Sequence, residues 1–262
     1  MIAGVGASKV RALARSAAIA VCAAMPLAAL ADLVDMLPRI KPAIVAVGTY
    51  QPTGSPAFRF RGTGFAVGNG SLIATNAHVL PDAVADEQME SLAIAVPGEK
   101  RSTVRKAARV AIDKNHDLAV LRIEGPPLPP LALNGSEAVR EGQSIALTGF
   151  PIGSVLGLAP VTHRGIVAAI TPIGIPQARA QALDPVLVRR LANDPFRVYQ
   201  LDATTYPGNS GSPVFDPANG RVIGVVNMVF VKSTKENVLS EPSGISYAIP
   251  IEYLKTLLDG LD

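Results

Sequence analysis

The chain has a single cysteine, and this scarcity excludes a fold held together by disulfide bonds. Cys22 lies among the first 31 residues, which we expect to be removed, so the remaining chain has no cysteine. The 231 residues that remain (262 − 31) are enough to build a hydrophobic core. With only three histidines and no Cys/His cluster, the sequence predicts no metal site and no cofactor.

The chain also lacks an N-terminal apolar run long enough to cross a membrane. The run Ala17–Leu30 has about 14 residues, against the roughly 20 that a spanning helix needs. Basic residues precede it (Lys9, Arg11 and Arg15), and the small-x-small sequence Ala29-Leu30-Ala31 ends it. This pattern predicts a signal peptide over residues 1–31 and an exported protein, periplasmic or secreted. A retained membrane anchor is the alternative.

An excess of basic charge is absent once the signal peptide is set aside. The chain has 24 basic and 21 acidic residues, and three of the basic ones lie in residues 1–31. The remainder therefore has 21 of each and a net charge of zero, with histidine neutral. We see no electrostatic case for binding nucleic acid or an anionic membrane.

Short apolar, β-branched runs recur along the chain, separated by Gly, Pro, Asn and Asp. This spacing predicts an all-β barrel or sandwich rather than alternating βα units. The stiff Pro-rich segment that begins at Gly125 divides the chain near its middle, with a boundary at about 125–142. The predicted strands are Ala43–Val47, Gly64–Val67, Ser71–Thr75, Leu92–Val96, Leu118–Ile123, Ser144–Thr148, Gly165–Thr171, Val198–Leu201, Pro213–Phe215 and Val222–Phe230.

Three stretches have helical spacing of their apolar residues. Asp32–Arg39 should lead into the first strand, and Gln177–Ala192 is interrupted by Pro185. Ile251–Leu261 follows a proline and places four apolar or aromatic residues on one face. We expect this last helix to pack on the outside of the second barrel.

The segment Tyr206–Pro213 is the strongest candidate for a catalytic turn. It presents Ser210 between Gly208 and Gly211, where small residues let a substrate backbone approach closely. The N–H groups of Gly208 and Ser210 would form an oxyanion hole. Because a serine hydroxyl is a weak nucleophile at neutral pH, the segment predicts a nearby base.

Two upstream motifs supply the other groups for acyl transfer. His78 would act as the general base, and Asp117 would orient it and stabilise the imidazolium. The order His, Asp, Ser is that of the chymotrypsin-type triad. His116 precedes Asp117 directly and would point to the opposite face of a strand, so we interpret it, like His163, as a structural residue.

At this point the chain resembles the HtrA/DegP group of trypsin-like serine proteases. The resemblance implies a chymotrypsin-like double β-barrel over residues 32–262, with a short helix at each end. It also implies ATP-independent endopeptidase activity on unfolded or partly folded polypeptides, in protein quality control or narrow processing. The motifs that carry it are Gly62-Thr63-Gly64-Phe65, Asn76-Ala77-His78-Val79, Asp113–Leu121, Gly149-Phe150-Pro151-Ile152-Gly153, Arg164-Gly165-Ile166-Val167, Gln200-Leu201-Asp202-Ala203, the Ser210 segment and Tyr247-Ala248-Ile249-Pro250.

The sequence departs from the family pattern in three places. Only residues 252–262 follow the last motif, so we expect no peptide-binding PDZ domain. Ser212 replaces a glycine that the family has after the nucleophile. The segment 171–199 is long for the family, and its role as a lid, trimer contact or surface insertion is open. A non-catalytic, chaperone-like polypeptide-binding protein on the same scaffold is the alternative function.

The resemblance also suggests a specificity pocket and an assembly. The pocket would be formed by Thr204, Asn227, Met228, Val229 and Ser246, and it contains no carboxylate, so small or medium aliphatic side chains should enter it. The family suggests a homotrimer formed near Asp32–Arg39 and the loop Gln51–Phe60. Phe58 and Phe60 would lie in this interface or pack on their own barrel.

Overall fold

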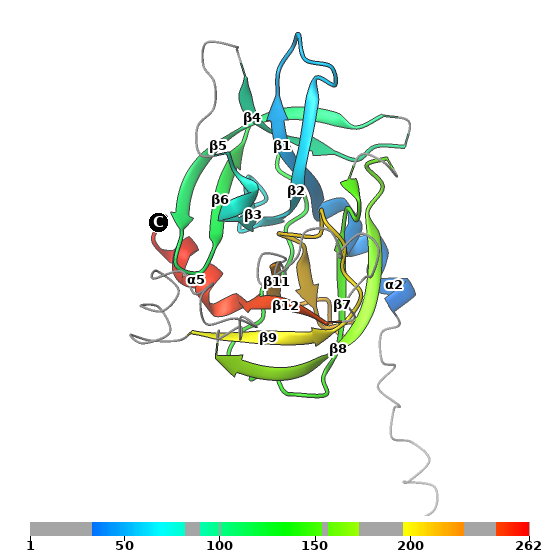
Figure 1. Ribbon diagram of the computed structural model, residues 1–262, viewed down its shortest axis with the longest axis vertical. Coiled ribbons are helices and arrows are strands. Elements are labelled where there is room, and N and C mark those ends of the chain that lie inside the picture. The colour runs from blue at the N-terminus through cyan, green and yellow to red at the C-terminus, as the bar shows by residue number, and fades with distance from the viewer. Residues whose placement is uncertain are drawn as a thin grey trace, which may run out of the picture. The chain divides into compact units, whose positions relative to one another are not determined.

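The computed structural model describes residues 33–81, 90–99, 101–153, 157–172, 196–227 and 245–261. Within them, two six-stranded antiparallel barrels confirm the predicted all-β double barrel, with a short helix before the first strand and another after the last (Figure 1). The predicted signal peptide and the predicted helix Gln177–Ala192 lie outside the described residues.

The first barrel is built from β1 to β6, in the order β1-β2-β3-β6-β5-β4. Strand β1 closes it by pairing with β2 on one side and β4 on the other. The helical segments before and within this barrel are α2 (Leu33–Ile40), η1 (Lys41–Ala43) and η2 (Ala77–Val79). Its strands are β1 (Ile44–Tyr50), β2 (Phe58–Val67), β3 (Leu72–Asn76), β4 (Ser91–Val96), β5 (Thr103–Asp113) and β6 (Leu118–Ile123).

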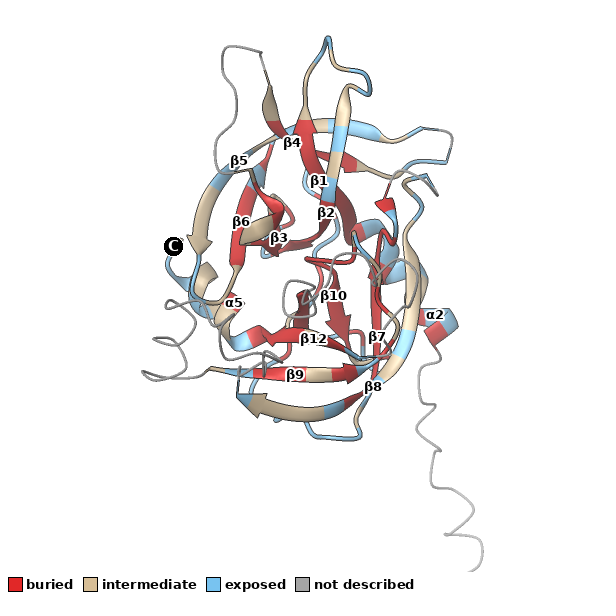
Figure 2. Ribbon diagram, viewed as in Figure 1, coloured by how far each residue is buried: buried red, intermediate tan, exposed pale blue. Residues whose placement is uncertain are grey.

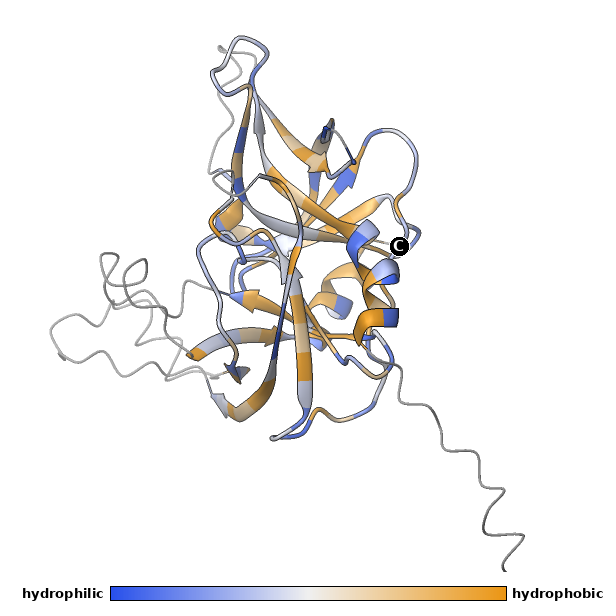
Figure 3. Cartoon of the chain, turned by 90° about the vertical axis from the view of Figure 1, so that its right-hand side faces the viewer, coloured by the Kyte–Doolittle hydropathy of each residue, from blue (hydrophilic) through white to orange (hydrophobic). Residues whose placement is uncertain are grey.

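The second barrel contains β7 to β12, in the order β10-β11-β12-β9-β8-β7. Its apolar core includes Leu147, Leu201, Val214 and Val226, all with no exposed surface (Figure 2). Its strands are β7 (Ser144–Gly149), β8 (Val161–Pro172), β9 (Arg197–Asp202), β10 (Pro213–Phe215), β11 (Val222–Asn227) and β12 (Ile245–Pro250). The hydropathy colouring agrees, because apolar stretches follow the strands and hydrophilic residues gather in the turns (Figure 3).

The two terminal helices attach through apolar faces. In α2, buried Leu33, Met36 and Ile40 recur at helical spacing, and the glycine at 220 leaves room for the Met36 sulfur, which would lie 2.5 Å from a Cβ there. The helix α5 (Ile251–Asp259) packs against β11 and β12 of the second barrel, as expected, and also against β5 and β6 of the first. None of the helices in the described ranges is both long and apolar enough to cross a bilayer.

The two phenylalanines expected near a trimer interface are both half-buried within the chain. The Phe60 ring contacts the Phe150 ring edge-on, with centroids 6.2 Å apart. A Cβ on Gly153 would lie 2.5 Å from the Phe60 ring, and one on Gly48 would lie 3.0 Å from the ring of Phe58. The Phe60 ring thus contacts residues that follow β7 in the second barrel, and a part of each ring stays exposed, so their place in a trimer interface stays a prediction.

Candidate active site

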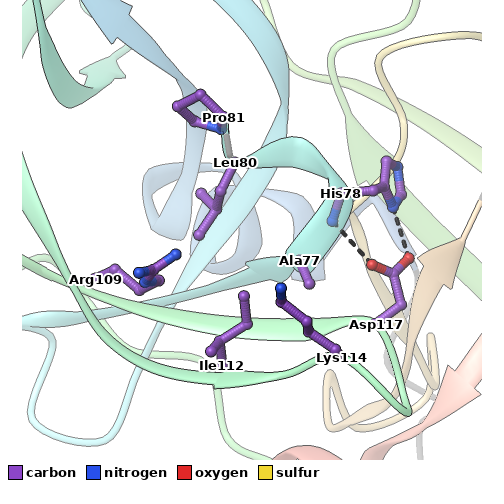
Figure 4. A pocket seen from close by; sticks show the side chains of 8 residues that line it. All are labelled: Ala77, His78, Leu80, Pro81, Arg109, Ile112, Lys114 and Asp117. Atoms are coloured by element: carbon purple, nitrogen blue, oxygen red, sulfur yellow. Dashed lines mark hydrogen bonds and ion pairs between the residues drawn. The ribbon is translucent and has the colours of Figure 1, made fainter. Parts of the chain in front are cut away.

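His78 and Asp117 form a close side-chain pair at the edge of the first barrel. The His78 Nδ1 and Asp117 Oδ2 atoms are 2.6 Å apart, and the His78 backbone N–H donates to Asp117 Oδ1 at 2.9 Å (Figure 4). Their side chains are 28% and 19% exposed. With Nδ1 held by the carboxylate, Nε2 is the ring nitrogen that can exchange a proton with another group.

The turn that carries Asp117 is shaped by the carboxylate of Asp113. Asp113 Oδ1 accepts the N–H groups of Asn115 at 2.9 Å and His116 at 3.1 Å. Asp117 then takes φ = 53°, in the left-handed region that a non-glycine residue rarely adopts. This reversal is a local consequence of Asp-x-Asn, because aspartate readily bonds the backbone N–H two residues on.

The same turn is tied to the histidine segment. The Asp117 carbonyl accepts the N–H of Ala77 at 3.1 Å and the Asn76 side-chain amide at 3.0 Å. On the other side of His78, the Arg61 Nε donates to the Val79 carbonyl at 2.6 Å. Side chain and backbone contacts thus hold the short helix η2, and with it the imidazole, against the β5–β6 turn.

Asn227 is a third member of this site that sequence analysis assigned elsewhere. Its Nδ2 donates to Asp117 Oδ2 at 2.7 Å, the same oxygen that contacts His78 Nδ1. Asn227 is fully buried at the end of β11, in the second barrel. Its place in the wall of a specificity pocket stays a prediction, and no local signal in the sequence could reveal a contact across 110 positions.

Ser210 lies in a tight turn that glycines make possible. The Asn209 N–H donates to the Tyr206 carbonyl at 3.0 Å, and the Ser212 N–H donates to the Asn209 carbonyl at 2.9 Å. Gly208 has φ = 103° and Gly211 has φ = 86°, values that favour glycine. Ser210 itself is 6% exposed.

Strand β2 brings the serine turn and the histidine segment together. The Thr63 N–H donates to the Ser210 carbonyl at 2.8 Å. A Cβ on the neighbouring Gly62 would lie 3.0 Å from that carbonyl oxygen and 2.6 Å from Val79 Cγ2. The residue next to His78 and the backbone of Ser210 therefore touch the same glycine, from opposite barrels. The Gly211 N–H donates to the carbonyl of residue 226, next to Asn227, at 3.0 Å.

The backbone N–H groups of Gly208 and Ser210 are those predicted to form the oxyanion hole. The Gly208 carbonyl accepts a hydrogen bond from the Thr63 hydroxyl at 2.7 Å. Among the backbone–backbone hydrogen bonds of the described ranges outside regular helices and strands, Asn209 N–H donates, but neither the Gly208 nor the Ser210 N–H does. Two N–H donors that flank an engaged one suit stabilisation of a developing oxyanion.

The side chain of Ser212 lies against the glycine at position 149. Its side chain is fully buried, and a Cβ on Gly149 would lie 1.9 Å from its Oγ, so any larger residue at position 149 would have to displace that hydroxyl. Ser212 Oγ and both polar atoms of the buried Asn209 amide have no hydrogen-bond partner among the described residues. The neutral amide of Asn209 avoids the larger cost of an unpaired buried charge.

The remaining pocket residues are only partly described. Thr204 is half-buried, and buried Ser246 donates its hydroxyl to the Ala203 carbonyl at 3.1 Å. Met228 and Val229 lie outside the described residues. The aliphatic preference of this pocket thus stays a prediction.

A second His–Asp pair lies on the other side of the β5–β6 turn. The His116 Nδ1 is 2.6 Å from Asp113 Oδ2, and the His116 ring stacks on Tyr253 of α5 at 4.0 Å and 17°. Phe196 contacts the imidazole edge-on at 4.7 Å. Burial raises the pKa of Asp113, but hydrogen bonds from His116 and Asn115 and the charge of His116 outweigh burial and lower it. His116 thus ties the turn to the C-terminal helix.

The chain is similar in sequence to known peptidases. The model of the trypsin-like peptidase domain family matches residues 62–225. A probable periplasmic serine endoprotease, DegP-like, from Halomonas elongata is 33% identical over 204 residues, which cover 78% of this chain and 35% of that protein. The mitochondrial serine protease HTRA2 of Drosophila pseudoobscura pseudoobscura is 30% identical over 207 residues, 79% of this chain and 40% of that protein.

Among solved structures, the serine endoprotease from Yersinia pestis matches with a TM-score of 0.60 and 24% identity. The match covers 88% of this chain and 66% of that chain. At this identity the likeness bears on the fold alone. The chain spans only 35 to 40% of the length of the two curated relatives.

Proposed function

Since this chain belongs to the trypsin-like serine peptidase family, in its DegP-like and HtrA-like group, we propose that it is a serine endopeptidase acting on polypeptides. The observation that carries the proposal is the 2.6 Å contact of His78 and Asp117, joined through Gly62 to the turn of Ser210. A serine nucleophile, a histidine base and an aspartate that orients the base are the three groups of the serine-protease triad.

In the proposed mechanism, the Ser210 hydroxyl attacks the carbonyl carbon of the scissile peptide bond. His78 Nε2 accepts the hydroxyl proton and later donates it to the leaving amine. Asp117 keeps the imidazole oriented and stabilises its protonated form, while Asn227 holds the carboxylate from the second barrel. The N–H groups of Gly208 and Ser210 stabilise the tetrahedral oxyanion, and water then hydrolyses the acyl-enzyme.

The cellular setting follows from the sequence and the relatives. The DegP-like relative is named a periplasmic enzyme, and the basic, apolar N-terminus of this chain has the pattern of a signal peptide. We propose that the protein is exported, and that it degrades unfolded or partly folded polypeptides in quality control. Assembly as a homotrimer, formed near Asp32–Arg39 and the loop Gln51–Phe60, belongs to the same proposal.

The decisive comparison is digestion of casein by the purified protein and by its Ser210→Ala variant. We expect the variant to lose about 10⁶-fold in kcat. The Ser71→Ala variant, changed at a half-buried turn serine of the first barrel, should cleave at the wild-type rate. Casein binding without cleavage by both the wild type and Ser210→Ala would instead support a non-catalytic polypeptide-binding protein.

A further inference from the structure

The peptide unit between Pro207 and Gly208 contains one of the two predicted oxyanion donors, the Gly208 N–H. In a trans peptide unit the N–H and the C=O point in opposite directions, so the position of the carbonyl sets the direction of the donor. The Pro207 carbonyl accepts the N–H of Ile152 at 2.7 Å. Gly208, with φ = 103°, has no side chain that would restrict this peptide unit, and the bond from Ile152 supplies the restriction instead.

The next two peptide units of the turn are held in the same way. The second predicted donor, the Ser210 N–H, shares a peptide unit with the Asn209 carbonyl, which accepts the Ser212 N–H at 2.9 Å. Between the two donors lies the Gly208 carbonyl, which accepts the hydroxyl of Thr63 at 2.7 Å. Three consecutive peptide units are thus each held through a carbonyl, and the middle one is held by a side chain of the first barrel.

The Thr63 hydroxyl also joins this turn to the loop that follows β7. It donates to the Gly208 carbonyl and accepts the N–H of Phe150 at 3.1 Å. Phe150 lies two residues before Ile152, whose N–H holds the Pro207 carbonyl. The hydrogen bonds therefore close a ring that starts at the Thr63 hydroxyl, passes through the serine turn to Ile152, and returns through Phe150.

Thr63 itself has a single defined position. It has no exposed surface, its N–H donates to the Ser210 carbonyl at 2.8 Å, and its carbonyl accepts the Thr75 hydroxyl at 2.7 Å. Thr75 is three residues before His78 and pairs it to the same strand region. Because the backbone and the hydroxyl of Thr63 are all engaged, its hydroxyl is a fixed reference point for the turn around Gly208.

The loop that the hydroxyl holds has a backbone that needs outside support. Ile152 has φ = 57°, which is an outlier for a β-branched residue, and Gly153 follows with φ = 56°. Such conformations persist where the surrounding structure determines them, and they often occur beside active sites. The Phe60 ring gives further support, since a Cβ on Gly153 would lie 2.5 Å from it and a Cβ on Gly208 would lie 3.0 Å from it.

We propose that Thr63 is a positioning residue for the oxyanion hole. Its hydroxyl ties the loop of Phe150 and Ile152 to Gly208, and this tie directs the Gly208 N–H toward the oxygen that becomes negative during attack by Ser210. The proposal rests on the proposed peptidase function, because it assigns a role in that reaction. An interaction that acts on the developing charge stabilises the transition state and not the bound substrate, so it contributes to kcat rather than to KM.

The test compares Thr63→Val, which keeps the shape of the side chain and removes the hydroxyl, with Thr63→Ser, which keeps the hydroxyl. Loss of a whole oxyanion donor costs about 10²–10³ in kcat, so a donor that is only misdirected in Thr63→Val should cost about 10- to 100-fold, with KM within about twofold of the wild type. Thr63→Ser should keep kcat within about threefold of the wild type. Thr148→Val is the matched control, because Thr148 is also buried but its hydroxyl lies 2.8 Å from that of Thr162, outside the ring. It should keep the wild-type kcat.

A pair of inhibitors separates the oxyanion hole from general distortion of the site. A substrate-derived peptide aldehyde forms a reversible adduct in which the Ser210 oxygen bonds to the aldehyde carbon, the carbonyl oxygen becomes an oxyanion, and the hydroxyl proton passes to His78. The corresponding peptide alcohol binds without forming this adduct. In Thr63→Val the inhibition constant of the aldehyde should rise by about the same 10- to 100-fold factor as kcat falls, and that of the alcohol should stay within about twofold.

Urea unfolding accompanies each measurement, because valine leaves the Gly208 carbonyl and the Phe150 N–H without their partner and should lower stability. If Thr63→Val does not fold, Thr63→Cys replaces it. Cysteine has the shape of serine but only a weak donor and acceptor, so Thr63→Cys should lose kcat relative to Thr63→Ser.

The outcomes distinguish this inference from the peptidase function itself. Ser210-dependent cleavage with a kcat for Thr63→Val within twofold of the wild type would overturn the role of Thr63 alone. Equal losses of kcat in Thr63→Val and Thr63→Ser would also overturn it, since packing of the methyl group and not the hydroxyl would then be responsible. So would equal weakening of the aldehyde and the alcohol. Absence of any Ser210-dependent cleavage by the wild type would remove the proposed function together with the inference.

Discussion

Replacement of Asn227 by alanine tests whether the second barrel holds the catalytic carboxylate in place. The Asn227 amide lies 2.7 Å from Asp117 Oδ2 and is fully buried, so no solvent can replace it without rearrangement. A hydrogen bond to a charged group contributes roughly 1.5–3 kcal/mol. If that bond serves to orient the Asp117–His78 pair in the transition state, its loss should lower kcat by about 10- to 100-fold with little change in KM.

The assay is steady-state cleavage of a fluorogenic peptide, with urea unfolding of each variant in parallel. Asn134→Ala is the matched control, because Asn134 is also buried and its Nδ2 donates at 2.8 Å, but to the Glu137 carbonyl and far along the chain from the site. Both variants should lose stability, and only Asn227→Ala should lose kcat. Equal losses of kcat in the two variants, or a kcat for Asn227→Ala within twofold of the wild type, would refute the reasoning.

Three further predictions concern stability. Gly211→Ala should lower the free energy of unfolding, measured in urea, by several kcal/mol, because the added Cβ would lie 2.0 Å from a backbone carbonyl oxygen. Gly142→Ala is the control: Gly142 has a similar φ of 80° but open space around it, so this change should cost only about 1–2 kcal/mol. Burial lowers the pKa of His163 below 6.5, so near this pH the unfolded chain binds more protons than the folded chain, and the free energy of unfolding should fall as pH drops through 6.5. His163→Phe should flatten this dependence of stability on pH. An unchanged dependence would show that His163 is not its source. Tyr253→Ala should lower the melting temperature, because it removes the ring stacked on His116, while Tyr253→Phe should keep the ring and a melting temperature near that of the wild type. Equal melting temperatures of the wild type and Tyr253→Ala would show that the stack is unimportant.

Much of the fold could be predicted because buried strands leave a local signal. Pro213–Phe215 is both the predicted strand and β10, and Leu118–Ile123 is both the predicted strand and β6. Strand β5 was not predicted because it carries exposed or half-buried residues throughout, including three basic ones, and its longest run of apolar residues that includes large ones is only Val110–Ile112. Strand β2 begins six residues before the predicted Gly64, where aromatic and basic residues alternate.

The site was less accessible to prediction because its members meet through tertiary contacts. Motif order could suggest His78, Asp117 and Ser210, but the amide of Asn227 reaches Asp117 from the other barrel. Simple strand alternation placed His116 on the face opposite Asp117, and only the left-handed turn explains its pairing with Asp113. Each of these contacts depends on how the barrels are folded together rather than on neighbouring residues.

Strand β5 illustrates the same limit. Arg109 and Ile112 are three positions apart on this strand, so period-two alternation predicts that they lie on opposite faces. One unpaired residue, Val110, changes that alternation, and it becomes visible only in the register with β6. Arg109 and Ile112 both line a pocket beside His78.

The central claim is that Ser210 is a nucleophile activated by His78, and its reaction with a serine-directed phosphonate tests this most directly. Mass spectrometry of the folded wild-type protein should find one adduct, on Ser210, and His78→Ala should slow its formation by about 10²–10⁴-fold, the usual contribution of a general base. Modification of Ser210 at the same rate in both proteins, or of a different serine in the wild type, would contradict the account.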